Sequence, residues 1–160
     1  MARKGPILLA TMALALPAAL AQEAGPIAYP EGFRRWAHVK TQLVTPDNPR
    51  AGRFVGMHHI YANALALEGY ESGRFPDGAV IVFDLLDVRA DKGTTDEGPR
   101  KFTDVMVKDS RRFASTGGWG YEEFAGPSHE RQLDAAKAAA CSACHERLAP
   151  TDHVISTLRE

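Results

Sequence analysis

The segment Cys141-Ser-Ala-Cys144-His145 constrains this chain more than any other. Two cysteines three positions apart, followed at once by a histidine, form the attachment motif of a c-type haem. On a helix, positions i, i+3 and i+4 share one face, so both thiols can reach one porphyrin while His145 turns its imidazole to the iron. These are the only two cysteines in the sequence. The motif predicts one covalent haem c per chain, held by Cys141 and Cys144, with His145 as the metal ligand.

Three other uses of the two cysteines are open at this point. A zinc site would need a fourth ligand from His129 or His153. A thioredoxin-like dithiol usually lies where a strand turns into a helix, whereas residues 133–140 have the composition of a helix interior. A disulfide between positions i and i+3 would close a loop too short to stabilise much. Haem attachment is favoured over all three.

The start of the chain has the pattern of an export signal. Arg3 and Lys4 give it a positive charge, and residues 7–16 are apolar but too short to span a bilayer comfortably. Ala19-Leu20-Ala21 is a small-residue cleavage site. We expect residues 1–21 to be a signal peptide, with an uncleaved membrane anchor as the alternative. Export to the periplasm also suits the motif, because bacterial c-type haem is attached outside the cytoplasm.

The remaining residues, 22–160, are enough for one domain with a real core. Loss of Arg3 and Lys4 changes the formal net charge from −1 to −3. The chain has no basic excess and no stripe of Lys and Arg, so nucleic acid is not expected as a partner. No segment after residue 21 is long and apolar enough to cross a membrane, so no membrane association is expected after cleavage.

Alternating and β-branched residues predict that most of the middle of the chain is a β-sheet. Residues 79–88 are apolar on both faces for most of their length and are expected to form a central strand. Asn63 and Gly73 suit the start and end of a short helix over residues 64–71. The charged residues 90–98 are expected to be a solvated loop. The other expected strands lie within 38–45, 53–61, 101–108 and 116–124.

The end of the chain is expected to be helical. Ser128 is the expected cap of a long helix that carries the haem motif to about Arg147, and a last short helix should open at Thr151. The expected fold class is therefore α+β, a sheet with short helices and a C-terminal haem-bearing helix. No methionine follows the motif, and only Met57 and Met106 precede it in the mature chain. A sixth iron position without the usual methionine ligand favours the binding of a small molecule.

Four short motifs follow one another in order along the chain. They are Phe33-Arg-Arg-Trp36 with His38-Val-Lys-Thr-Gln42, Gly73-Arg-Phe-Pro-Asp-Gly78, Val107-Lys-Asp-Ser-Arg-Arg-Phe113 and Cys141–His145. In this order, over residues 30–158, they resemble the cytochrome P-460 family. That family includes hydroxylamine-oxidising cytochromes P-460 and the cytochromes c-prime-beta, which bind NO and CO. The resemblance implies a periplasmic homodimer built on an antiparallel sheet.

The resemblance also implies which residues face the haem. The family's enzymes cross-link a lysine to the porphyrin from the strand after the Asp-Gly turn, and matching that strand puts Phe83 at the lysine position. No lysine occurs in residues 41–91. Phe54 then matches a second phenylalanine over the distal haem face. His58 falls where the enzymes have an arginine, and Asp104 falls where they have a carboxylate that handles protons.

The alternation of the strands is compatible with these assignments. Phe54 and His58 share one face of the strand expected to begin at Arg53, and Asp104 shares a face with Phe102. Ordinary core packing is the alternative for Phe54 and Phe83, hydrogen-bonded core for His58, and a solvated carboxylate for Asp104. His59 faces the other way and is expected to be structural. The remaining histidines of the mature chain, expected at the surface, are His38, His129 and His153.

Together these residues predict a gas-binding cytochrome of the c-prime-beta kind, with NO as the representative ligand. His145 would be the proximal ligand, and its other ring nitrogen should donate a hydrogen bond that tunes it. Phe83 and Phe54 would keep water off the iron. One alternative is a P-460-type haem oxidoreductase acting on hydroxylamine or NO, with His58 and Asp104 as its catalytic polar groups. The other is a simple electron-transfer cytochrome, and the sequence does not indicate a redox partner.

Overall fold

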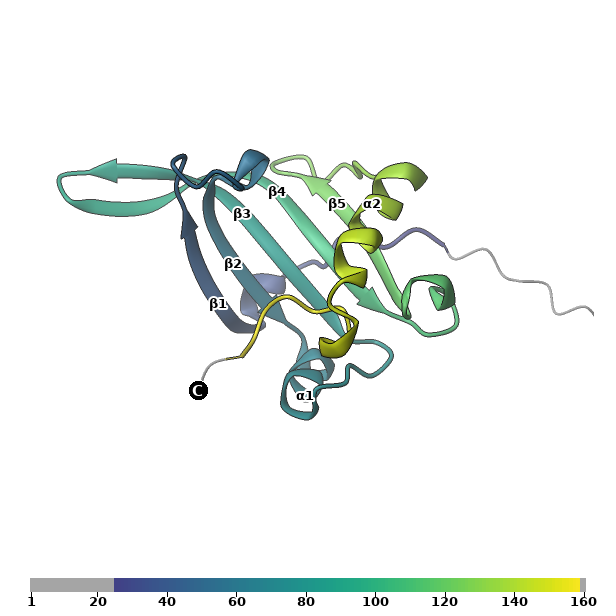
Figure 1. The fold of residues 1–160 in the computed structure, drawn as a ribbon. Coiled ribbons are helices and arrows are strands. Elements are labelled where there is room, and N and C mark those ends of the chain that lie inside the picture. The colour runs from purple at the N-terminus through teal and green to yellow at the C-terminus, as the bar shows by residue number, and fades with distance from the viewer. Residues whose placement is uncertain (1–24, 159–160) are drawn as a thin grey trace, which may run out of the picture.

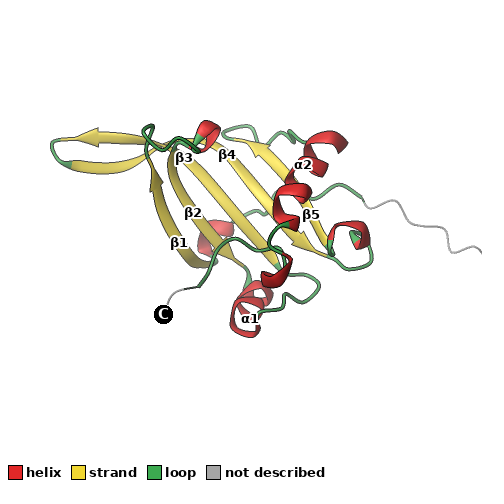
Figure 2. Ribbon diagram, viewed as in Figure 1, coloured by secondary structure: helices red, strands yellow, loops and turns green. Residues whose placement is uncertain are grey.

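The chain folds around one antiparallel sheet, described by a computed structural model for residues 25–158 (Figures 1 and 2). Each of the five strands pairs with the next in sequence, in the order β1-β2-β3-β4-β5. This architecture confirms the predicted α+β class; the expected signal peptide, residues 1–21, lies outside the described residues. The strands are β1 Ala37–Val44, β2 Gly56–Ala62, β3 Val80–Asp91, β4 Thr94–Lys108 and β5 Trp119–Ala125. The helices are α1 Ala64–Ser72 and α2 Ala135–Glu146, with short 3-10 turns η1 Phe33–Arg35, η2 Gly52–Phe54, η3 Ala114–Thr116 and η4 Ala149–Thr151.

The register of the sheet decides which side chains meet on each face. β3 is the central strand, as predicted, and its Phe83 pairs with Ile60 on one side and Asp104 on the other. Asp104 in turn pairs with Glu123 of β5. Because directly paired residues point to the same face, these four side chains form one row across the sheet.

The segment expected to be a charged loop is a β-hairpin instead. β3 and β4 run on past the body of the sheet and meet at a turn, where Lys92 and Gly93 have φ of 45° and 85° (Figure 1). Positive φ at both central residues is typical of the tight turns that match the twist of a hairpin. The prediction for residues 90–98 failed because the hairpin extends into solvent. Both of its faces are therefore polar, without the alternation that marks a half-buried strand.

Helix α1 follows the predicted start and stop signals. The side chain of Asn63 accepts a hydrogen bond from the Ala66 amide at 2.9 Å, and Gly73 ends the helix with a φ of 76°. The helix packs against the sheet through a core that includes Ala66, Phe75 and Trp119. This part of the fold could be predicted because its signals are local.

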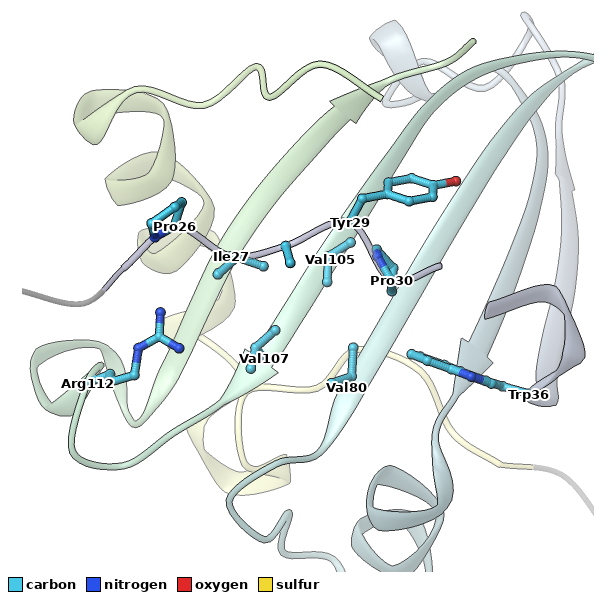
Figure 3. Close-up of a pocket in the computed structure, with 10 residues that line it drawn as sticks. Pro26, Ile27, Tyr29, Pro30, Trp36, Val80, Val105, Val107 and Arg112 are labelled. Carbon is cyan, nitrogen blue, oxygen red and sulfur yellow. The ribbon is translucent and has the colours of Figure 1, made fainter. Parts of the chain in front are cut away.

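The N-terminal arm, residues 25–36, covers the opposite face of the sheet from α2 (Figure 3). Tyr29 packs edge-on against both Phe33 and Phe124, at ring-centroid distances of 6.0 and 5.2 Å. A cavity of about 340 Å³ lies along the arm, and the described residues that line it include no Cys, His, Asp or Glu. Its lining is mainly apolar, with Trp36, Val80 and Val107 beside the arm. The arm therefore contributes core packing to this face.

The second helix starts later than predicted. Asp134, not Ser128, is its N-cap, and the Asp134 side chain accepts a hydrogen bond from the Lys137 amide at 2.9 Å. Ser128 accepts only from the Glu130 amide, at 3.4 Å, in the segment that leads from β5 to the helix. The last predicted helix, opening at Thr151, is also wrong, because Thr151 ends the 3-10 turn η4 and an irregular segment follows. Within residues 25–158, no helix has the length and apolar character needed to cross a membrane.

Candidate functional site

A largely apolar cavity of about 400 Å³ lies between one face of the sheet and the C-terminal part of the chain. Its volume is within the range of cofactor and small-molecule sites. All seven residues proposed from the sequence line it, namely Phe54, His58, Phe83, Asp104, Cys141, Cys144 and His145. The fold therefore brings the haem motif and the four expected distal residues to one place, although they span positions 54 to 145.

Helix α2 presents the three motif residues to this cavity. Cys141, Cys144 and His145 lie within one turn, so they share the side of the helix that faces the sheet. The two thiols are free, with Cys141 half-buried and Cys144 exposed. Burial raises the pKa of the Cys141 thiol. None of the α2 side chains is fully buried, because the inward face of the helix borders the cavity rather than the sheet.

The imidazole of His145 is held by a backbone carbonyl. Its Nδ1 lies 2.7 Å from the carbonyl oxygen of His153, so Nδ1 carries the proton and donates. This is the tuning hydrogen bond that the sequence predicted, although its acceptor was not foreseen. Burial lowers the pKa of His145, which favours the neutral ring. With Nδ1 protonated, the lone pair of Nε2 is left to bind a metal.

His153 itself was expected at the surface, and this prediction is wrong. His153 is only 8% exposed, and its backbone has a φ of 66°. A Cβ on Gly117 would lie 2.2 Å from the His153 ring, so only glycine allows this close approach. This contact could not be predicted from the sequence, because Gly117 and His153 are far apart along the chain.

The sheet side of the cavity is aromatic. The Phe83 ring packs against Phe54 and Phe102 at centroid distances of 6.0 and 6.3 Å, and against His58 at 4.7 Å. Phe54 does not belong to the strand in which it was predicted. It ends the 3-10 turn η2, just before β2, and it remains 40% exposed at the edge of the cavity.

His58 is engaged by the backbone next to it. Its Nε2 hydrogen-bonds to the carbonyl oxygen of Phe54, so this nitrogen donates and is not free to bind a metal. Burial lowers the pKa of His58. Both interpretations open from the sequence therefore hold in part, since His58 lines the cavity and is also a hydrogen-bonded core residue. His59 faces the other side of the sheet, as expected, where Nε2 pairs with Glu97 at 2.9 Å.

Asp104 sits beside a second carboxylate. Burial, with a smaller contribution from the negative charge of Glu123, raises the pKa of Asp104 to about 8. Glu123 is the direct cross-strand partner of Asp104 and forms an ion pair with Arg53 of η2. Arg53 also lies over the Phe102 ring, 4.2 Å from its centroid. The cavity thus has one corner where a carboxyl group retains a proton near neutral pH.

Several residues of the cavity wall were not singled out from the sequence. Lys40 and Gln42 contribute from the edge strand β1, Tyr121 from β5, and Ile155 from the C-terminal segment. Alternation along residues 38–45 puts Lys40 and Gln42 on one face of their strand. It does not say which face meets the cavity, and the C-terminal segment has no periodic signal at all.

The two histidines that a zinc site would require, His129 and His153, make other contacts. His129 stacks on Tyr29 of the N-terminal arm, at a centroid distance of 3.7 Å. His153 gives its carbonyl oxygen to His145, and its ring Nδ1 lies 3.7 Å from a Glu146 carboxylate oxygen. Of the remaining histidines expected at the surface, His38 is exposed.

A β-sheet that encloses an apolar cavity with a Cys-x-x-Cys-His helix defines the class of haem-binding cytochromes. The comparison with known families gives the same result. The family model described as Cytochrome P460 matches residues 30–156, which is most of the chain. The chain therefore belongs to the Cytochrome P460 family. Among curated proteins, no match to this chain was found.

Membership of this family implies a haem cofactor, and the residues of the cavity fit one. The cavity is apolar, as a porphyrin requires, and both cysteines and His145 line it. The hydrogen bond from Nδ1 of His145 fixes the tautomer that an axial ligand needs. The residues that would hold the haem are thus Cys141, Cys144 and His145.

Proposed function

We propose that this protein is a periplasmic monohaem c-type cytochrome that binds a small diatomic gas such as NO, as the cytochromes c-prime-beta do. The observation that carries the proposal is the aromatic cluster around Phe83, which lines the same cavity as the haem motif. In the family's enzymes the resemblance implies a lysine at this position. An apolar ring there supports gas binding rather than cross-linked haem chemistry.

On the helix side of the cavity, Cys141 and Cys144 would form the two thioether bonds and His145 would be the proximal ligand. The haem, when bound, supplies an iron whose sixth position can take a diatomic gas. The hydrogen bond to the His153 carbonyl orients His145 and raises the basicity of its imidazole. The helix and the segment that follows it would thereby hold one side of the cofactor.

On the sheet side, Phe83 and Phe54 exclude water and offer no hydrogen bond to a bound ligand. His58 does not compete for the iron through Nε2, because that nitrogen donates to the Phe54 carbonyl. This arrangement supports a five-coordinate iron in the resting protein. It also supports discrimination in favour of NO and CO over O₂, which gains more from a hydrogen-bond donor.

Optical and resonance Raman spectra of both oxidation states, with and without NO, test the proposal. We expect a five-coordinate, high-spin ferrous haem that binds NO. A low-spin, six-coordinate spectrum at neutral pH would contradict it. The variant His58→Ala would then show whether His58 is the sixth ligand, because its loss would restore the high-spin form.

The variant Phe83→Ala tests the apolar cap directly. Water should then reach the iron, so the ferric haem should become six-coordinate. Phe113→Ala is the matched control, because Phe113 is also half-buried but packs on the opposite face of the sheet. The control should leave the spectra unchanged.

A hydroxylamine-oxidising enzyme is the second candidate, and the Asp104–Glu123 corner is the observation that favours it. A carboxyl group that stays protonated near neutral pH can supply a proton in the cavity. Lys40 also lines the cavity and is the one lysine available there for a cross-link among residues 25–158. A ferrous Soret band far to the red, together with turnover of hydroxylamine, would establish this alternative.

A plain electron carrier is the remaining alternative. Its reduced haem would be six-coordinate and indifferent to NO.

Export and assembly have independent tests. Mass spectrometry of the mature protein should find an N-terminus near Gln22, and light scattering should give the mass of a homodimer.

A further inference from the structure

The backbone carbonyl that holds the His145 ring belongs to a strained corner of the chain. Asp152 and His153 are consecutive, and both have left-handed φ angles, of 49° and 66°. This conformation is disfavoured for residues that carry a side chain. The His153 carbonyl that accepts from His145 is set by this corner. Something must hold the corner in place.

An ion pair joins the corner to the sheet. Nζ of Lys108, at the end of β4, lies 2.7 Å from Oδ1 of Asp152. Both side chains are only 10% exposed. Nζ also donates to the carbonyl of Gly117 at 3.0 Å and lies 5.1 Å from the centroid of the Trp119 ring. Three contacts therefore fix the position of the Lys108 ammonium group.

Asp152 is bound at three points. Its Oδ2 accepts from the Phe75 amide at 2.8 Å, while Oδ1 takes the ion pair with Lys108. Its backbone carbonyl accepts from the Trp119 indole at 2.8 Å. Each of these three partners lies outside the C-terminal segment. They fix the corner to the body of the protein, whereas hydrogen bonds within residues 148–154 only shape its turn.

We propose that Lys108 and Asp152 are positioning residues for His145, acting through the His153 carbonyl to set the strength of the proximal hydrogen bond. The inference rests on the proposed role of His145 as the axial ligand. A shorter, better directed bond to Nδ1 makes the imidazole a stronger donor to the iron. Loss of the ion pair lets the corner move and weakens this bond.

The variants Lys108→Met and Asp152→Asn test the proposal on the haem-loaded protein. Asp152→Asn is the milder change, since the amide oxygen can still accept from Phe75. We expect the ferrous iron–histidine stretching band to move to lower frequency in both variants. The midpoint potential should rise, because a weaker donor favours the reduced iron. Lys108→Arg, which restores a cation, should return both quantities toward the wild-type values.

The matched control is Arg131→Met, which breaks a second ion pair of a buried carboxylate. Nε of Arg131, in the segment before α2, lies 2.6 Å from Oε2 of Glu122, and this pair includes neither Asp152 nor the His153 carbonyl. This variant should lower thermal stability as Lys108→Met does, but leave the stretching band and the potential unchanged. If Lys108 contributed to stability alone, Lys108→Met and Arg131→Met would be indistinguishable in both the stretching band and the midpoint potential.

The possible failures are separable. If the wild-type protein shows no iron–histidine band, the proposed function fails at His145. If the band is present but stays fixed in Asp152→Asn and Lys108→Met, the positioning role is wrong while the proposed function stands. An equal shift in Arg131→Met would also overturn it, because the effect would then follow any loss of a buried ion pair.

Discussion

The carboxyl group of Asp104 departs from the ordinary behaviour of an aspartate. An exposed aspartate loses its proton near pH 3.8, whereas burial and the charge of Glu123 hold the proton of Asp104 up to a pH of about 8. Between these values the folded protein retains a proton that the unfolded chain releases. The favourable contribution is complete below pH 3.8 and is lost as the pH rises to about 8.

The variant Asp104→Asn should therefore gain stability over the wild type as the pH rises from 4 to 8. The gain should approach about 1.4 kcal/mol for each pH unit in which only the folded state holds the proton. Chemical denaturation of the haem-loaded protein at a series of pH values measures it. Glu123→Gln removes the neighbouring charge and so lowers the pKa of Asp104. The fall in stability of this variant with rising pH should therefore end at a lower pH than in the wild type. A constant difference between Asp104→Asn and wild type across this range would contradict the raised pKa.

At the scale of elements, helix α2 provides a direct test of where a helix begins. Asp134→Ala removes the side-chain oxygen that caps the Lys137 amide and should cost about 1 kcal/mol. Ser128→Ala, at the cap expected from the sequence, should change stability by a few tenths of a kcal/mol at most. Thermal unfolding of the two variants gives the comparison. A larger loss for Ser128→Ala would show that the helix extends back into the preceding segment.

The elements also show what could be predicted from sequence. Helix α1 and the central strand were predicted well, because Asn63, Gly73 and the apolar run of 79–88 are local signals. The start of α2 was not, since Ser128 and Asp134 are both good caps and only tertiary contacts choose between them. Arg131 bonds to Glu122 and holds the intervening segment extended. The hairpin was missed because its polar faces carry no periodic pattern.

The same distinction holds for the candidate site. The haem motif is continuous in sequence, and the family resemblance pointed to His58, Phe83 and Asp104, which do line one cavity. The carbonyl of His153 and the ion pair of Lys108 with Asp152 could not be found this way. Their partners are separated by stretches without any periodicity, and they meet only because the C-terminal segment folds back over the sheet (Figure 1).

At the scale of the whole molecule, the sheet is one continuous unit. The stability of the C-terminal part depends instead on what fills the cavity beneath it. Helix α2 contacts the sheet mainly through β5 and buries no side chain fully. The haem-free variant Cys141→Ala/Cys144→Ala should therefore be cut by protease within residues 126–150 at least about tenfold faster than the haem-loaded protein, because local opening of this segment becomes easier. Limited proteolysis with mass spectrometry measures both rates. The exposed hairpin tip provides the internal control, since its cleavage should be equal in the two forms.

The pairing order of the sheet has a consequence for the time course of folding. Every strand pairs with its neighbour in sequence, so all the strand contacts are made within residues 37–125. Such local connectivity favours rapid folding. The segment that carries both cysteines and His145 is about the last quarter of the described residues, and it docks on a sheet whose strands all precede it in the sequence. A chain that is synthesised N-terminus first can therefore build the sheet wall of the cavity before Cys141, Cys144 and His145 have been made.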